Sequence, residues 1–116
     1  MLSLPPSVRV LLCLAPADMR RGFDALARMA ADVLAEDPLS GHLFVFRSRR
    51  GDRLKILYWD RDGYALFYKR LEKGTFAFPE APGAASLSVS ASDLALILGG
   101  IDLARVVRRK RYEKSA

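Results

Sequence analysis

The chain has 116 residues, of which 51% are hydrophobic and 28% are charged, and its formal net charge is +6. This balance argues against a disordered protein, and no apolar run reaches the ~18 residues that a membrane helix requires. The N-terminus lacks the pattern of a secretory signal, and the single cysteine cannot form an internal disulfide. We therefore expect a reduced, cytoplasmic protein with one hydrophobic core and no membrane contact.

The positive charge is concentrated in two short segments. Residues 47–53, "RSRRGDR", carry four arginines and one aspartate, and residues 105–116 carry six basic groups and one glutamate. Each of the two remaining stretches, 1–46 and 54–104, has a net charge of −1. Concentrated charge of this kind raises the local potential and favours a polyanionic partner.

The first elements predicted are a strand and a long helix. Residues 8–14, "VRVLLCL", form an apolar run between prolines, which is typical of a short buried strand. Apolar residues then recur at three- and four-residue steps from about Met19 to Glu36, which predicts a helix with Asp18 as its cap. Arg20 and Arg21 would lie in its first turn, where the helix dipole disfavours cations.

The middle of the chain predicts antiparallel hairpins. "HLFVF" (42–46) and "LKILYW" (54–59) predict strands joined by the arginine-rich loop, with Gly51 at its tip. Asp62-Gly63 marks a second turn, over residues 60–63, which leads into a third strand. "TFAFP" (75–79) would add a short edge strand.

The C-terminal part predicts a short strand and a short helix. "LSVS" (87–90) follows a flexible connection over residues 80–86, and Ser90 or Ser92 can cap a helix that Gly99 and Gly100 stop. The predicted fold is α+β: an antiparallel β-meander of three to five strands packed against one long N-terminal helix and one short C-terminal helix. Residues 1–104 would form a single domain, and residues 105–116 a basic, mobile tail.

The catalytic and metal-binding alternatives have weak support. His42 is the only histidine and has no cysteine near it in the sequence, which disfavours a His/Cys metal site. A Cys13–His42 nucleophile pair would need a reactive thiol, whereas Cys13 lies in an apolar run. Asp60 and Asp62 could bind a cation, but aspartate is also common in turns. We predict no enzyme activity, no metal and no cofactor.

Nucleic-acid binding has better support. Four arginines in one loop exceed what solubility requires, and arginine suits bidentate phosphate contacts. Trp59 and Tyr68 could stack bases or pack in the core, and the tail could be a DNA-binding arm or a solubilising segment. The residues predicted to bind nucleic acid are Arg20, Arg21, Arg47, Arg49, Arg50, Arg53, Lys55, Lys69, Arg70, Arg108, Arg109, Lys110 and Arg111.

The arginines at the start of the predicted helix fit this interpretation. Arg20 can pair with Asp24 four residues later, whereas Arg21 has alanine at the equivalent position. Gly22 weakens a helix and would allow close approach of a ligand or another backbone. We therefore expect Arg20 and Arg21 to serve an anion, either a phosphate or an internal acid, rather than the helix.

Three ordered strings carry a family resemblance: "DMRRGFDALA", "HLFVFRSRRGDRLKILYWDRDGYALFYKRLEKGTFAFP" and "LILGGID". They resemble the accessory protein of insertion-sequence-66 elements, the product of the second open reading frame (TnpB type), over about residues 8–110. The resemblance implies a small non-catalytic protein that acts in transposition beside a separate transposase. The chain departs from the family pattern at Thr75, Phe78 and Gly99.

Residues and resemblance together predict an accessory protein of DNA transposition that binds DNA phosphates at the element ends. The alternative is an adaptor that docks onto the transposase or another accessory subunit without contacting DNA. A cryptic enzyme is the third hypothesis. The oligomeric state stays open, since an exposed edge at residues 75–78 would permit sheet pairing between copies.

Overall fold

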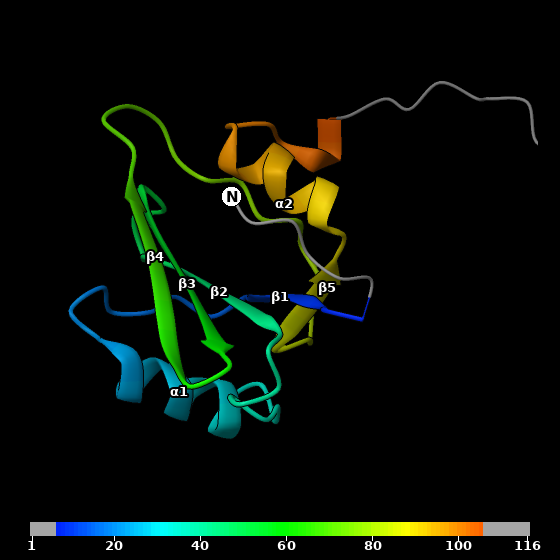
Figure 1. The fold of residues 1–116 in the computed structure, drawn as a ribbon. Helices are drawn as coiled ribbons and strands as arrows, with labels where there is room; N and C mark the ends of the chain where they lie inside the picture. Colours follow the sequence, from blue (N-terminus) through cyan, green and yellow to red (C-terminus); the bar gives the residue numbers. More distant parts are fainter. Residues whose placement is uncertain (1–6, 106–116) are drawn as a thin grey trace, which may run out of the picture.

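The structure is a computed structural model and describes residues 7–105. It contains one five-stranded sheet with a helix on each face (Figure 1). The strands are β1 (Val10–Cys13), β2 (Leu43–Arg47), β3 (Arg53–Asp60), β4 (Gly63–Arg70) and β5 (Ser86–Val89). The helices are α1 (Phe23–Asp32), α2 (Ala91–Leu98) and the short 3-10 helix η1 (Leu103–Arg105). The predicted α+β class is confirmed.

The sheet is mixed, with strand order β4-β3-β2-β1-β5. Strands β2, β3 and β4 form the predicted antiparallel meander, with both hairpin turns where the sequence places them. The prediction of a purely antiparallel sheet is wrong at β1, which pairs with β2 in parallel. The reason is the connection between them: α1 carries the chain back along the sheet, as a crossover between parallel neighbours requires.

Strand alternation divides the core into two layers. One face of the sheet packs against Leu26, Met29 and Ala30 of α1. The other face packs against Leu94 and Ile97 of α2. The strand residues of the α1 layer are Leu11, Cys13, Phe44, Phe46 and Leu57, and those of the α2 layer include Val10, Leu12, Leu43, Val45, Leu54 and Ile56. Successive strand residues therefore face opposite helices.

Helix α1 is shorter than the sequence predicts. It spans ten residues, from Phe23 to Asp32, instead of residues 19–36, and its N-cap is Gly22 rather than Asp18. Residues 18–21 form a separate turn in which the amide of Arg21 donates to the carbonyl of Asp18. At the other end, Ala35 has a positive φ of 54°, which helical backbone does not allow. Arg20 and Arg21 thus precede the helix instead of lying in its first turn.

Residues 75–79 do not form the predicted edge strand. Phe76 is buried in the α2 layer, and its amide donates to the carbonyl of Gly51, so this segment covers a sheet face. The predicted strand near residues 87–90 is confirmed as β5, which pairs with β1. The two edges of the sheet are therefore β4 and β5, and an edge at residues 75–78 is ruled out.

The C-terminal tail lies almost entirely outside the described residues. This applies to the predicted DNA-binding residues Arg108, Arg109, Lys110 and Arg111, so the predicted role of the tail stays a prediction. Within residues 7–105, no helix is long and apolar enough to cross a bilayer.

Helix α2 depends on its predicted cap. The Ser90 hydroxyl accepts a hydrogen bond from the amide of Asp93 at 3.0 Å. We expect Ser90→Ala to lower the free energy of unfolding by about 1 kcal/mol, because an N-terminal amide of the helix loses its acceptor. Ser88→Ala, on the exposed part of β5, is the control and should change it by less than about 0.5 kcal/mol. Urea denaturation measures both, and equal values would contradict the capping role.

Candidate nucleic-acid interface

The arginine-rich loop between β2 and β3 is held by hydrogen bonds at several points. The amides of Ser48 and Gly51 donate within the loop, to the carbonyls of Arg53 and Ser48 respectively. The Ser48 hydroxyl donates to Asp52 at 3.3 Å and accepts from the Arg53 amide at 3.2 Å. Gly51 has φ of 82°, and a Cβ there would lie 3.3 Å from Thr75, so glycine is required. Arg49 and Arg50 therefore project from a fixed turn.

The segment that precedes α1 is fastened to the sheet by Lys55. The Lys55 ammonium, on the neighbouring strand β3, donates to the carbonyls of Met19 and Arg21, both at 2.7 Å. Its nitrogen also lies 4.6 Å from the centre of the Tyr68 ring. The Lys55 residue is only 6% exposed, so its charge is used inside the protein. Lys55 fastens the segment to the sheet, and its buried ammonium does not face a phosphate in the solvent.

Arg20 is held by an acidic side chain in the same segment. Its guanidinium donates to both carboxylate oxygens of Asp18, with the shortest distance at 2.7 Å, and its amide donates to the same side chain. These hydrogen bonds, led by the one from the side chain, lower the pKa of Asp18 to about 2. The internal acid expected for Arg20 is thus Asp18, two residues before it, and not Asp24.

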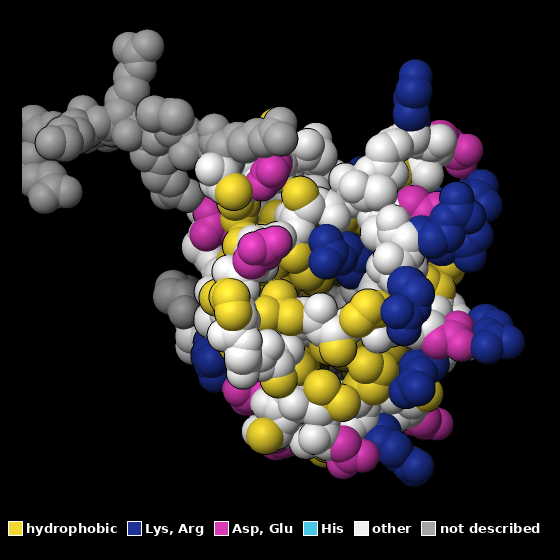
Figure 2. All heavy atoms as spheres, turned by 180° about the vertical axis from the view of Figure 1, so that it is seen from behind, with side chains coloured by type: hydrophobic (Ala, Val, Ile, Leu, Met, Phe, Trp, Pro, Cys, Tyr) yellow, Lys and Arg dark blue, Asp and Glu magenta, His cyan; other side chains and the backbone are white. Residues whose placement is uncertain are grey.

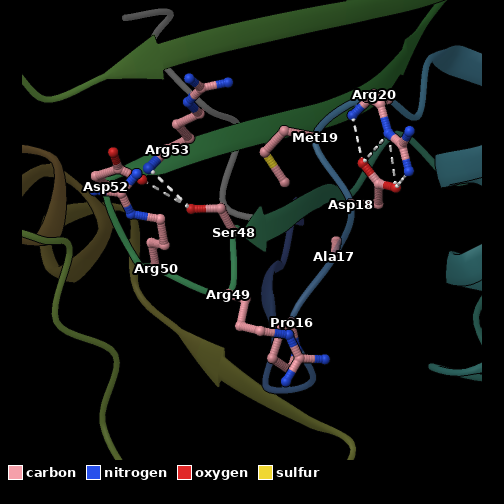
Figure 3. A pocket seen from close by; sticks show the side chains of 10 residues that line it. All are labelled: Pro16, Ala17, Asp18, Met19, Arg20, Ser48, Arg49, Arg50, Asp52 and Arg53. Atoms are coloured by element: carbon pink, nitrogen blue, oxygen red, sulfur yellow. Dashed lines mark hydrogen bonds and ion pairs between the residues drawn. The ribbon is translucent and has the colours of Figure 1, made fainter.

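A pocket of about 590 Å³ lies between the arginine-rich loop and the segment that precedes α1, which form its two walls (Figure 3). It is lined by Pro16, Ala17, Asp18, Met19, Arg20, Ser48, Arg49, Arg50, Asp52 and Arg53. Four arginines and two aspartates give this lining a net charge of +2. We call it the arginine pocket. It joins two basic segments that are about thirty residues apart in the sequence.

The basic surface continues from the pocket onto β4. Arg53 lies directly opposite Arg70 in the β3–β4 register. The two line a shallower hollow of about 350 Å³ together with Tyr68 and Glu72. Arg53 donates to the Tyr68 hydroxyl at 3.5 Å, and Arg70 pairs with Glu72 at 3.1 Å. Figure 2 shows basic side chains gathered along the side of the molecule that carries β4 in Figure 1.

Two predicted residues lie on the other face of the sheet. Arg47 donates to the carbonyl of Phe76 at 2.9 Å and lies 4.3 Å from the centre of the Phe78 ring. Burial lowers its guanidinium pKa. Lys69 is opposite Leu54, on the α2 face, and its ammonium lies 3.3 Å from the carbonyl of Leu98. The sheet therefore separates Arg47 and Lys69 from the arginine pocket.

All four arginines of the pocket are among the residues predicted from the sequence, whereas the polar side chains that frame it are not. Asp18 was predicted as a helix cap, and Ser48 and Asp52 were not singled out. Ser48 and Asp52 flank two arginines of the loop, and serine and aspartate often bond to nearby backbone in turns. This spacing is the signal that could have predicted their role. Of the two aromatic residues left open, Tyr68 adjoins the basic hollow. Trp59 instead contacts Tyr64, edge to face with ring centres 5.1 Å apart.

The residues that the sequence offers for nucleophilic catalysis are Cys13 and His42, and the structure places them apart. Cys13 ends β1, and burial raises its thiol pKa. The ring of His42 accepts a hydrogen bond from the amide of Arg9, which directly precedes β1. Arg9 is four residues before Cys13, so the histidine ring lies roughly 13 Å from the cysteine along the sheet. That separation rules out the Cys13–His42 pair. Within the part of the chain that the structure describes, no three His, Cys, Asp or Glu residues are grouped to hold a metal ion.

Comparison with known proteins supplies the family. The model of the family described as "IS66 Orf2 like protein" matches residues 8–108. The chain belongs to this family. This confirms the resemblance drawn from the three strings. No solved structure matches the chain.

Two similar proteins come from Sinorhizobium fredii. The uncharacterized protein y4hO is 44% identical over 102 residues, which cover 88% of both chains. The uncharacterized protein y4jC is 40% identical over 111 residues, which cover 94% of both chains. This IS66 Orf2-like chain thus matches both relatives over nearly their whole length.

The role of Lys55 can be tested by removing its charge. We expect Lys55→Met to lower the free energy of unfolding by at least about 2 kcal/mol, because two carbonyls are deprived of a charged donor. Lys69→Met removes an exposed lysine with one long hydrogen bond and should cost less than about 0.5 kcal/mol. Urea denaturation compares the two. If Lys55→Met were as stable as the control, the fastening role would be wrong.

The pair of Asp18 and Arg20 can be tested by titration. The carboxyl shift of Asp18 in NMR spectra should titrate near pH 2, and Arg20→Gln should raise the midpoint towards the ordinary value of 3.8. Because the folded pKa lies below the unfolded one, the pair stabilises the fold above pH 4. That contribution disappears as the pH falls towards 2. Arg28→Gln, on the exposed face of α1, should leave the midpoint unchanged, and an unshifted midpoint in Arg20→Gln would exclude the pair.

Proposed function

We propose that this IS66 Orf2-like protein is a non-catalytic accessory protein of DNA transposition that binds DNA phosphates in the arginine pocket. The family supports the transposition context. The partners in this proposal are the DNA of the element ends and, in the same complex, the transposase and the other accessory subunits.

The observation that carries the proposal is the state of Arg49 and Arg50. Both are exposed, and within residues 7–105 neither makes a hydrogen bond or ion pair. The loop that holds them is fixed by Ser48, Asp52 and Gly51, so the backbone of the loop loses little entropy when a ligand binds. Two such guanidinium groups on the wall of one pocket suit the bidentate contacts that arginine makes with phosphate.

The opposed pair of Arg53 and Arg70 supports the same ligand chemistry. Like charges directly opposite each other on neighbouring strands destabilise a sheet. The carboxylate of Glu72 neutralises only one of them. A phosphate between the two guanidinium groups would relieve the repulsion, and the adjacent ring of Tyr68 offers a surface for a base or sugar. The proposed interface excludes Lys55, because its charge is buried, and it excludes Arg47 and Lys69, because they lie on the α2 face of the sheet.

The test is a salt titration of binding to duplexes from element ends and to random duplexes. Removing one arginine that binds a phosphate should reduce the slope of log K against log salt by about 0.9. The double variant Arg49→Gln/Arg50→Gln should therefore bind more weakly, with a slope smaller by about 1.8. A full-length variant with glutamine at Arg108, Arg109, Lys110 and Arg111 measures the contribution of the tail separately.

The matched control removes two exposed arginines outside the pocket. Arg28→Gln/Arg61→Gln lowers the net charge by the same amount, so a general effect of charge would appear equally in both double variants. Equal affinity and slope in the two would overturn binding at the arginine pocket. If the protein binds neither duplex and instead captures the transposase through Arg49 and Arg50, the adaptor hypothesis holds.

A further inference from the structure

Strand β4 forms a long, open edge of the sheet. It has eight residues and pairs only with β3 in the part of the chain that the structure describes. Residues 63–68 contain no charge and no proline, the usual features that block pairing at a sheet edge. Phe67 and Tyr68 are 37% and 47% exposed on this strand. An edge of this kind is suited to pairing with another strand.

The register of the hairpin shows which backbone groups face outward. The amide of Leu71 donates to the carbonyl of Asp52, on the side of β3. Inward- and outward-facing residues alternate along an antiparallel ladder, so odd-numbered residues of β4 bond to β3. The N–H and C=O groups of Tyr64, Leu66, Tyr68 and Arg70 therefore point to the free edge.

The charges at the two ends of β4 are opposite in sign. The turn before the strand contains Asp60, Arg61 and Asp62, with a net charge of −1, whereas Lys69 and Arg70 end the strand with a net charge of +2. A parallel neighbour with the same sequence would place like charges together. An antiparallel one would place the acidic turn beside the basic end, which favours the antiparallel arrangement.

We propose that β4 pairs antiparallel with β4 of a second copy of this chain, with Leu66 on the two-fold axis. In this register Asp62 is opposite the partner's Arg70, and Tyr64 is opposite the partner's Tyr68. All the residues that meet in hydrogen-bonded pairs are even-numbered, so the outward backbone groups are matched. The two-fold axis closes the assembly at a dimer.

The pairing has a consequence for the basic surface. Two antiparallel edge strands are related by an axis perpendicular to the sheet, so α1 of both copies covers the same face. A continuous sheet of ten strands would carry both arginine pockets on that face. The two Arg53–Arg70 pairs would be roughly 27 Å apart along the strands, since each lies four residues from the axis.

A charge swap across the dimer tests this register. Sedimentation velocity of nucleic-acid-free full-length protein should give a mass that rises from monomer to dimer with concentration. Asp62→Arg and Arg70→Asp should each raise the dimer Kd by about tenfold, because each places like charges together twice in the dimer. The double variant should restore dimerisation. The two residues lie at opposite ends of β4, so restoration cannot arise within one chain.

Arg28→Asp, on exposed α1, is the control for a general effect of charge and should not change the dimer Kd. A second measurement needs no substitution: the amides of Leu66 and Tyr68 should exchange slowly with solvent in concentrated protein and rapidly in dilute protein. A protein that stays monomeric at its highest soluble concentration would overturn the proposal. So would a dimer in which both single variants bind normally, or one in which the double variant is not restored.

Discussion

The arrangement of the candidate site depends on one buried charge, that of Lys55. Its ammonium joins β3 to the carbonyls of Met19 and Arg21, at the point where the chain leaves β1 and has not yet begun α1. The same contact holds one wall of the arginine pocket against the sheet. A core position is given to a cation because the backbone of that wall needs a donor there.

The arginines in and beside the pocket divide into those that another group of the protein already partners and those that have no partner within the described residues. Arg47 satisfies the carbonyl of Phe76 and packs on Phe78, and Arg20 is neutralised by Asp18. Arg49 and Arg50 line the same pocket as Arg20 and follow closely after Arg47 in the sequence, yet they have no such partners within the described residues. Charge density along the chain therefore overstates the size of a binding surface, and the partner of each guanidinium group decides whether it is available.

The edge of β4 and the arginine pocket are neighbours through Arg53 and Arg70. These residues end the hairpin on the face that α1 covers, next to the hollow lined by Tyr68 and Glu72. Any partner that extends the sheet at β4 would thus meet the margin of the basic surface. Strand pairing uses the backbone groups of a sheet edge, whereas anion binding uses side chains. The two interactions can therefore occur next to each other on a small protein with one sheet.

The sequence by itself determined the α+β class, the β2–β3–β4 meander, both hairpin turns, the Ser90 cap and the concentration of arginine in one loop. These follow from short-range patterns: strand alternation, turn residues and capping. Tertiary structure alone decided the parallel pairing of β1 with β2, the start of α1 and the burial of Lys55. It also set the opposite faces of Arg47 and Arg49. Each of these depends on contacts between residues distant in the sequence, as when Lys55 meets Met19 and Arg21, and local periodicity carries no information about such contacts.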